Sequence, residues 1–192
     1  MKRTIILASK SPRRLDILRS HGYEPVVLPV DADESLPEGI DMESAVRLLA
    51  LKKARACFDI VSGKDEYSGC IIIGADTIVY KDEIMGKPED RQDAFRMLDA
   101  IRGTCHYVST GVAFIYVDSG KESVVNDVTA VYCRNYTDED IEAYLDTDEP
   151  YDKAGAYAIQ GIFGKHIDHI EGDYENVVGL PFHVIDKYLT LV

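Results

Sequence analysis

The fold of this chain is decided at its start, where the apolar run Thr4-Ile5-Ile6-Leu7-Ala8 leads directly into Ser9-Lys10-Ser11-Pro12-Arg13-Arg14. The apolar run predicts a buried strand. Ser11 suits the N-cap and Pro12 the first position of a following helix, which Gly22 is expected to end. The opening therefore predicts a strand, a basic turn and a helix N-terminus within one short piece of chain.

Such a turn is typical of an anion site. The free N–H groups at a helix N-terminus and the helix dipole favour negative charge, and arginine binds phosphate oxygens bidentately. The alternative is an ordinary capped helix whose arginines are solvated, because capping residues are common. The local sequence leaves both interpretations open.

The distribution of charge favours the anion site. The chain has 21 Lys and Arg against 34 Asp and Glu, a net charge of -13. Residues 1–20 nevertheless carry a net charge of +5, because only Asp16 opposes six basic residues: Lys2, Arg3, Lys10, Arg13, Arg14 and Arg19. An acidic body repels a nucleic-acid polymer, so a small phosphorylated ligand is the expected partner. The excess of carboxylates also fits a divalent metal, although acidic surfaces often serve solubility alone.

Length and composition predict a single domain over residues 1–192, without linkers or repeats. No apolar stretch is long enough to span a membrane, and the short N-terminal apolar run is a poor signal peptide, so we expect a cytoplasmic protein without a membrane partner. The scattered cysteines (Cys57, Cys70, Cys105 and Cys133) predict neither a zinc ribbon nor disulfides. His166 and His169 form an H-x-x-H pair, a weak metal candidate because no third ligand lies nearby in the sequence.

Helix and strand signals alternate along the chain, which predicts an α/β or α+β fold. Strands are expected at residues 4–8, 24–30, 70–74, 105–118, 122–134 and 167–170, and helices are expected to begin near residues 12, 41, 90, 137 and 181. Residues 149–161 are rich in small and polar side chains and are predicted to be irregular, as segments that line ligand sites often are.

Asp76 lies between two apolar, strand-like runs. Because burial of a lone carboxylate is costly, Asp76 either has a hydrogen-bonding or metal partner or lies at a strand end facing a cleft. The cleft position is where α/β proteins usually present catalytic groups. The simpler alternative is a strand-end aspartate that caps a turn.

A series of short motifs runs in order over nearly the whole chain: Leu7–Arg14, Asp33-Glu34, Leu51–Ala54, Gly74–Val79, Gly86-Lys87-Pro88, His106 with Thr110-Gly111-Val112, Glu149-Pro150, Asp152–Tyr157, Ile159-Gln160-Gly161 and Asn176–Pro181. In these motifs the chain resembles the Maf proteins, nucleoside triphosphate pyrophosphatases related in fold to the inosine triphosphatase-like enzymes. The resemblance is specific because many short motifs match in register.

The resemblance implies an α/β fold with a mixed twisted sheet flanked by helices and a central substrate cleft. It implies hydrolysis of a nucleoside triphosphate to the monophosphate and pyrophosphate with Mg²⁺ or Mn²⁺. Asp76 corresponds to the family's proton acceptor, and Glu34 is expected to be a metal-side or water-positioning carboxylate. Glu34 and Asp76 are both candidate metal ligands, and the sequence leaves open which of them binds the metal and which takes the proton. Substrate binding is expected from Ser9, Ser11, Arg13, Arg14, Lys52, Thr77, Lys87 and Gln160. A homodimer is also suggested, although no stretch of the sequence marks an interface.

Within the family, Arg13, Thr77 and Gln160 match the three positions that mark the dTTP/UTP pyrophosphatase branch, which implies house-cleaning of modified pyrimidine nucleotides. A glutamine amide offers a donor and an acceptor to the edge of thymine or uracil. The alternatives are a 7-methyl-GTP pyrophosphatase of the same family, a non-catalytic nucleotide-binding regulator of septum formation, and an unrelated phosphate-binding domain. Lys10 departs from the usual family residue and either tightens phosphate binding or is simply solvated.

Overall fold

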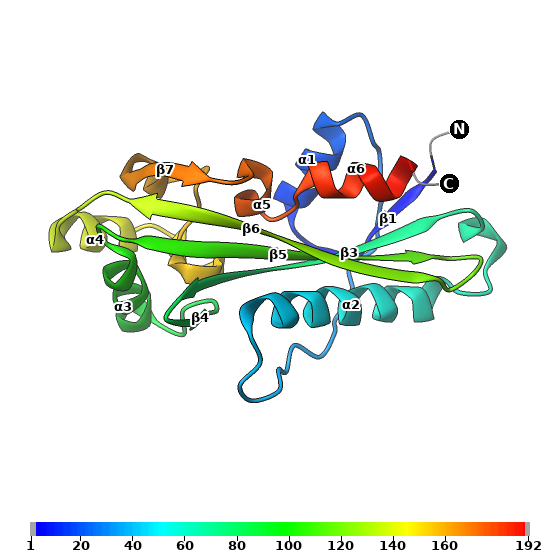
Figure 1. Cartoon of the computed structure of the whole chain (residues 1–192), viewed down its shortest axis with the longest axis horizontal. Coiled ribbons are helices and arrows are strands. Elements are labelled where there is room, and N and C mark those ends of the chain that lie inside the picture. Colours follow the sequence, from blue (N-terminus) through cyan, green and yellow to red (C-terminus); the bar gives the residue numbers. More distant parts are fainter. Residues whose placement is uncertain (1–2, 191–192) are drawn as a thin grey trace. The chain divides into compact units, whose positions relative to one another are not determined.

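The computed structural model describes residues 3–190, without the side chain of Thr190, so Lys2 of the basic N-terminal group lies outside it. It is an α/β structure, as the sequence predicts (Figure 1). Within the described residues, seven strands pair in the order β2-β1-β3-β5-β6-β7, and β4 pairs with β3. None of the described helices is both long enough and apolar enough to cross a membrane.

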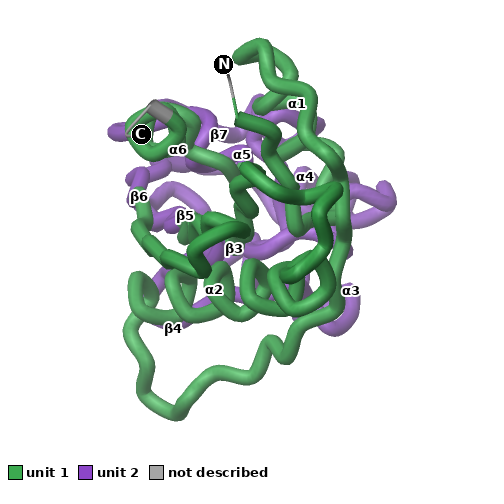
Figure 2. Tube along the Cα trace, turned by 90° about the vertical axis from the view of Figure 1, so that its right-hand side faces the viewer, with its two compact units in different colours: residues 1–76, 110–127, 179–192 green, residues 77–109, 128–178 purple. Residues whose placement is uncertain are grey.

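The chain divides into two compact units, coloured separately in Figure 2. The first comprises residues 1–76, 110–127 and 179–192, and the second comprises residues 77–109 and 128–178. Three strands run from one unit into the other: β3 (Ile71–Lys81), β5 (Cys105–Tyr116) and β6 (Glu122–Cys133). The remaining elements belong to one unit each.

The first unit contains the predicted opening. It comprises β1 (Ile5–Leu7), α1 (Pro12–Ser20), β2 (Val26–Val27), α2 (Met42–Val61), the 3-10 turn η1 (Asp65–Tyr67) and α6 (Phe182–Thr190). Strand β1 pairs in parallel with β2 and β3. Ser11 occupies the N-cap of α1, although its side chain makes no capping hydrogen bond within the described residues, and the chain turns at Gly22 with a φ of 77°.

Helix α2 packs against one face of the strands of this unit. Its buried side chains join those of β1, β3 and β5 in one apolar core: Ala50, Ala54, Cys57 and Val61 with Ile6, Ile72, Ala113 and Ile115. The packing is close because two strand glycines face the helix backbone. A Cβ on Gly74 would lie 2.5 Å from the Ala50 carbonyl oxygen, and one on Gly111 would lie 2.2 Å from that of Val46. Helices α1 and α6 lie on the opposite face (Figure 1).

The second unit has its own apolar core. Its elements are β4 (Glu83–Met85), α3 (Arg91–Ile101), α4 (Asp138–Leu145), the 3-10 turns η2 (Pro150–Asp152), η3 (Ala154–Ala156) and η4 (Ile162–His166), β7 (Ile167–Glu171) and α5 (Tyr174–Val178). Leu98 and Ile101 of α3 pack with Ile141 and Leu145 of α4 around Phe163. The helix expected to begin near residue 137 is α4, which begins with a capping box in which Thr137 and Asp140 are bonded reciprocally.

Most predicted elements are confirmed, and three details differ. The strand expected over residues 24–30 is reduced to Val26–Val27, because Pro25 and Pro29 flank it and proline lacks the N–H that a ladder requires. The predicted strand 70–74 continues without a break to Lys81. The short elements β4 and α5 were missed, since three to five residues carry little periodic signal.

Candidate functional site

The centre of the candidate site is an ammonium group shared by two carboxylates. Lys53 Nζ, from α2, lies 2.5 Å from Asp76 Oδ1 on β3 and 2.8 Å from Glu34 Oε1 on the loop before α2. The side chains of Lys53 and Asp76 are only 16% and 14% exposed, whereas that of Glu34 is 66% exposed. The predicted acids Asp76 and Glu34 therefore converge on one point, and one of them is largely removed from solvent.

Of the two alternatives that the sequence allowed for Asp76, a partner for its carboxylate or a place at a strand end, the structure excludes the strand end. Asp76 lies in the interior of β3 and not at a strand end. Its charge is instead compensated by Lys53, which is the partner that the first alternative required. The close approach of α2 makes this pairing feasible, because a Cβ on Gly74, two residues before Asp76, would lie 2.7 Å from the Ala54 backbone nitrogen.

Lys53 is the site residue that the sequence analysis missed in favour of Lys52. Lys52 Nζ instead lies 2.9 Å from Asp33 Oδ2 and donates to the Ser35 carbonyl oxygen. Hydrogen bonds from Ser35 and then Lys52 lower the pKa of Asp33 below its usual range. The available signal was helical spacing: Lys53 lies four residues after Leu49 and four before Cys57, both buried, so it shares their inward face.

Arg14 binds the protein's own backbone. Its Nε donates to the Gly179 carbonyl oxygen at 2.8 Å, and its Nη1 donates to the Ala75 carbonyl oxygen at 2.9 Å and to Ser9 Oγ at 3.1 Å. Enclosure of the guanidinium lowers the pKa of Arg14, and the charge of Asp76 opposes that shift. Arg14 thus joins the basic turn to β3, one residue before Asp76.

Ser9 connects the same turn to the helix. Its buried hydroxyl accepts from the Ser11 backbone N–H at 3.2 Å as well as from Arg14. Arg13 is half-buried on the first turn of α1. Lys10 is exposed and pairs with Asp31 at 2.9 Å, so its ammonium contacts an exposed loop carboxylate. The first unit therefore contains two bonded groups, Ser9 with Arg14 and Lys53 with its two carboxylates, and Arg14 reaches the backbone carbonyl next to Asp76.

The other predicted residues belong to the second unit. Thr77 is half-buried on β3, Lys87 is exposed just after β4, and Gln160 is exposed just before η4. The segments that carry Lys87 and the Asp152–Tyr157 motif are bonded, since the Gly155 N–H donates to the Gly86 carbonyl oxygen at 3.0 Å. Gly155 is required there, because its φ is 68° and a Cβ would lie 2.9 Å from the Val79 side chain.

Tyr157, the last residue of the Asp152–Tyr157 motif, packs in the core of the second unit. It is 5% exposed, and its hydroxyl lies 2.7 Å from Nε2 of His106, which is fully buried. Burial, with a smaller contribution from the charge of Lys81, lowers the pKa of His106 to about 4. The imidazole is therefore neutral at physiological pH and serves as a hydrogen-bonding core residue.

The H-x-x-H pair shows no sign of a metal centre. The His166 ring packs against Phe163 and Tyr136, whereas His169 stacks on Tyr132 and lies 2.9 Å from Asp168. Among residues 3–190, no cluster of three or more candidate metal ligands includes either histidine. Each ring has its own packing partners.

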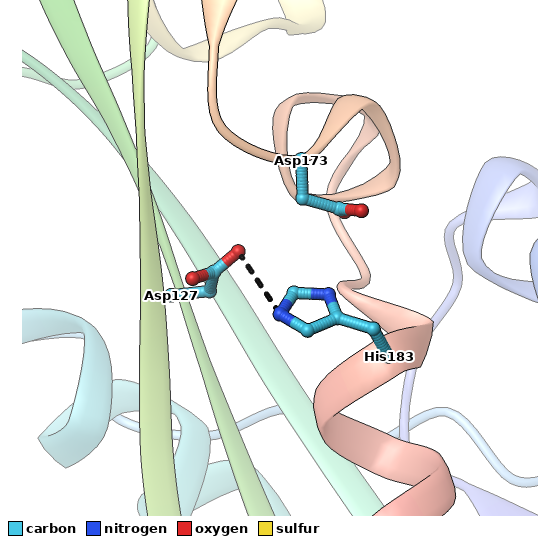
Figure 3. Close-up of side chains that lie close together, drawn as sticks. All are labelled: Asp127, Asp173 and His183. Carbon is cyan, nitrogen blue, oxygen red and sulfur yellow. Dashed lines mark ion pairs between the residues drawn. The ribbon is translucent and has the colours of Figure 1, made fainter.

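A separate pair in the first unit joins Asp127, from β6, to His183, from α6 (Figure 3). The Nε2 to Oδ2 distance is 3.8 Å, which is too long for a hydrogen bond and gives an ion pair only when the imidazole is protonated. Neither residue was singled out from the sequence. With 47% of the histidine side chain exposed, the pair contributes little to stability.

The chain therefore combines an α/β architecture with a basic turn at a helix N-terminus and with two carboxylates paired to one lysine. Features of this kind suit phosphorylated ligands. The comparisons with known proteins identify the family. The family model described as Maf-like protein matches residues 4–192, and the chain belongs to the Maf family.

Several relatives carry the same name, dTTP/UTP pyrophosphatase. The chain is 44% identical over 190 residues to the protein of that name from Desulfitobacterium hafniense, and the aligned region covers 98% of this chain and 85% of the relative. It is 47% identical over 189 residues to the one from Geotalea uraniireducens, covering 96% and 93%. It is 38% identical over 191 residues to the one from Bdellovibrio bacteriovorus, covering 99% of both chains.

Proposed function

We propose that this protein is a nucleoside triphosphate pyrophosphatase that acts preferentially on dTTP and UTP. Water attacks the α-phosphorus, the bond from that phosphorus to the α–β bridging oxygen breaks, and the products are the monophosphate and pyrophosphate. The names of the relatives support the substrate class. The observation that carries the proposal is the pair of carboxylates, Asp76 and Glu34, within 2.5 and 2.8 Å of one ammonium group.

Asp76 is the proposed proton acceptor. A general base must be a positioned group that takes a proton from the attacking water. Asp76 meets this requirement, because β3 fixes its backbone and Lys53 fixes its carboxylate. Lys53 also offsets the negative charge that a triphosphate brings to an already acidic pair. We therefore assign this neutralising role to Lys53, whereas the sequence analysis expected Lys52 among the substrate-binding residues.

The donor set fits a divalent cation such as Mg²⁺ or Mn²⁺. Carboxylate oxygens are the ligands that such hard cations prefer, and Glu34 and Asp76 already converge on one positive charge. These two residues would bind the metal. When bound, the ion supplies charge neutralisation to the phosphates and polarises the bond under attack.

The basic turn is the proposed phosphate site. Ser9 and Arg14 fix the shape of the turn through their mutual hydrogen bond and the contacts of Arg14 with the backbone. Arg13 and the hydroxyl of Ser11, both half-buried at the start of α1, then remain for phosphate oxygens, together with the dipole of this nine-residue helix. Lys87, exposed in the second unit, is proposed as a further phosphate donor.

Arg13, Thr77 and Gln160 are the proposed selectors of a pyrimidine base, with Gln160 reading its hydrogen-bonding edge. Gln160→Ala is expected to reduce turnover of dTTP and UTP by about tenfold or more, because one missing hydrogen-bonding group is worth at least that much in a specific site. Turnover of 7-methyl-GTP serves as the comparison. A wild-type preference for that purine would overturn the proposed substrate.

The test of catalysis is pyrophosphate release from dTTP and UTP with Mg²⁺ or Mn²⁺, compared between wild type and Asp76→Asn. The variant keeps the side-chain shape and removes the base, so we expect a rate loss of about 10²–10⁴-fold. A folded wild-type protein that binds a triphosphate without turnover would instead support the non-catalytic regulator of septum formation. A protein that neither binds nor hydrolyses triphosphates would refute the proposal.

We further propose that residues 1–192 act as one Maf-like domain in the cytoplasm, where nucleoside triphosphates are abundant. The four free cysteines fit a reducing compartment. The modified pyrimidine nucleotides remain a proposed physiological target, and a homodimer remains a proposal from the family resemblance. Sedimentation of the purified chain tests the dimer directly.

A further inference from the structure

Within the second unit, the exposed Gln160 lies on a short segment that contains no strand. The segment is fixed by a few backbone hydrogen bonds: the Gly161 N–H donates to the Ala158 carbonyl oxygen at 3.1 Å, and the Gly164 N–H donates to the Gly161 carbonyl oxygen at 3.0 Å. Ile159 and Phe163, on either side of Gln160, pack against the apolar core of the second unit. In addition to this packing, a polar contact joins the backbone of the segment to α4.

That contact is the carboxylate of Glu149. Its Oε2 accepts the Ile162 backbone N–H at 3.1 Å, and its Oε1 accepts the Tyr144 hydroxyl at 2.9 Å. Tyr144 belongs to α4 and is 3% exposed, so the carboxylate connects a core residue to the backbone two positions after Gln160. Burial, followed by the hydrogen bond to Glu149, raises the pKa of Tyr144 above its usual range, so the phenol stays a proton donor.

The glycine beside Gln160 fits this contact. A Cβ on Gly161 would lie 2.0 Å from Glu149 Oε1 and 2.4 Å from Oε2. Its φ of -98° is one that any residue adopts, so the backbone conformation alone does not require glycine. The absence of a side chain at position 161 leaves the space that the carboxylate occupies.

From this geometry we infer that Glu149 is a positioning residue for base selection: its carboxylate fixes the Gln160 segment so that the Gln160 amide meets the pyrimidine edge. The inference rests on the proposed function. It assigns Glu149 no part in proton transfer. A site that reads a base through one amide depends on placement, since a misplacement of about 1 Å can cost about 10²-fold in rate.

Glu149→Ala, Glu149→Gln and Gly161→Ala test the inference together. Alanine removes both acceptors. Glutamine restores the contact, because its oxygen accepts from Ile162 and its amino group donates to the Tyr144 oxygen. The alanine at position 161 keeps Glu149 and displaces its carboxylate. The control is Glu142→Gln on α4, whose exposed carboxylate pairs with Arg91.

The measured quantity is the ratio of kcat/KM for dTTP to that for dCTP, which carries a donor where thymine carries an acceptor. We expect this ratio to fall about tenfold in Glu149→Ala and Gly161→Ala, chiefly through the KM for dTTP. Glu149→Gln and Glu142→Gln are expected to keep the wild-type ratio. A ratio unchanged in Glu149→Ala, or lowered equally in Glu142→Gln, would overturn the inference.

Amide hydrogen exchange of Ile162 tests its hydrogen bond to Glu149 independently of any enzymatic activity. Exchange of this amide should accelerate in Glu149→Ala and stay protected in Glu149→Gln, and unchanged exchange in Glu149→Ala would refute the contact. A wild-type protein without pyrophosphatase activity would overturn the proposed function, and base selection with it, whatever the exchange rates. The two failures are therefore distinguishable.

Discussion

Replacement of Lys53 by methionine tests the centre of the site, and the neighbouring Lys52 provides a matched control. Lys53→Met removes the ammonium from the Asp76 carboxylate, of which only 14% is exposed. Removal of one partner from a buried ion pair costs about 3–5 kcal/mol. Because both side chains retain some exposure, we expect the lower limit, about 3 kcal/mol. Lys52→Met breaks the ion pair with Asp33, whose side chain is 70% exposed. An exposed ion pair of this kind contributes about 0–1 kcal/mol to stability.

Thermal and urea unfolding of both variants measure the difference. For a chain of this size, 3 kcal/mol corresponds to a fall of about 6–12 °C in Tm, whereas Lys52→Met should melt within about 4 °C of wild type. Turnover of dTTP provides the second measurement, with a loss of about 10²–10³-fold expected for Lys53→Met through the lost charge neutralisation. Equal losses of stability and turnover in the two variants would refute the distinction between the two lysines.

Two further predictions concern the cores. Gly111→Ala should destabilise the protein by about 3 kcal/mol or more, because its Cβ would lie 2.2 Å from the Val46 carbonyl oxygen, and backbone cannot move aside as a side chain can. Urea unfolding measures this, and Gly86→Ala, whose Cβ meets no atom within 4 Å, is the control; a mild effect at Gly111 would contradict the observed packing. Stability should also fall with pH between about 6.5 and 4, because the unfolded chain binds a proton at His106 there while the folded protein, with a pKa of about 4, does not. From pH 6.5 to 5 the loss should be roughly 2 kcal/mol, and His106→Gln should remove that part of the slope, so an unchanged slope would refute the assignment.

Much of the architecture is determined locally. The opening strand, the helix that begins at Pro12, the helix that begins after Thr137 and the two long strands β5 and β6 each depend on residues close together in sequence, and each was predicted. The family motifs likewise named Asp76 and Glu34 as candidate carboxylates of the site. These features are readable because caps, turns and periodic apolar residues act over a few positions.

The same local rules failed where partners are distant in sequence. Lys52 and Lys53 are identical in type and adjacent, and only the orientation of α2 on β3 decides which of them reaches Asp76. Two sequence interpretations of Asp76, at a strand end or with a partner, were equally consistent with its neighbours, and the long-range ion pair selected the second.

The sequence alone therefore determined that this protein has a basic strand–turn–helix opening and an α/β fold, and it predicted a site that includes Asp76 and Glu34. The tertiary structure decided which side chains meet which partners: Lys53 beside Asp76, Arg14 on the backbone of β3, and Glu149 on the Gln160 segment. The physical reason is that these contacts join residues that lie 13 to 61 positions apart in the sequence. Which residues meet at that separation depends on how the helices and strands pack.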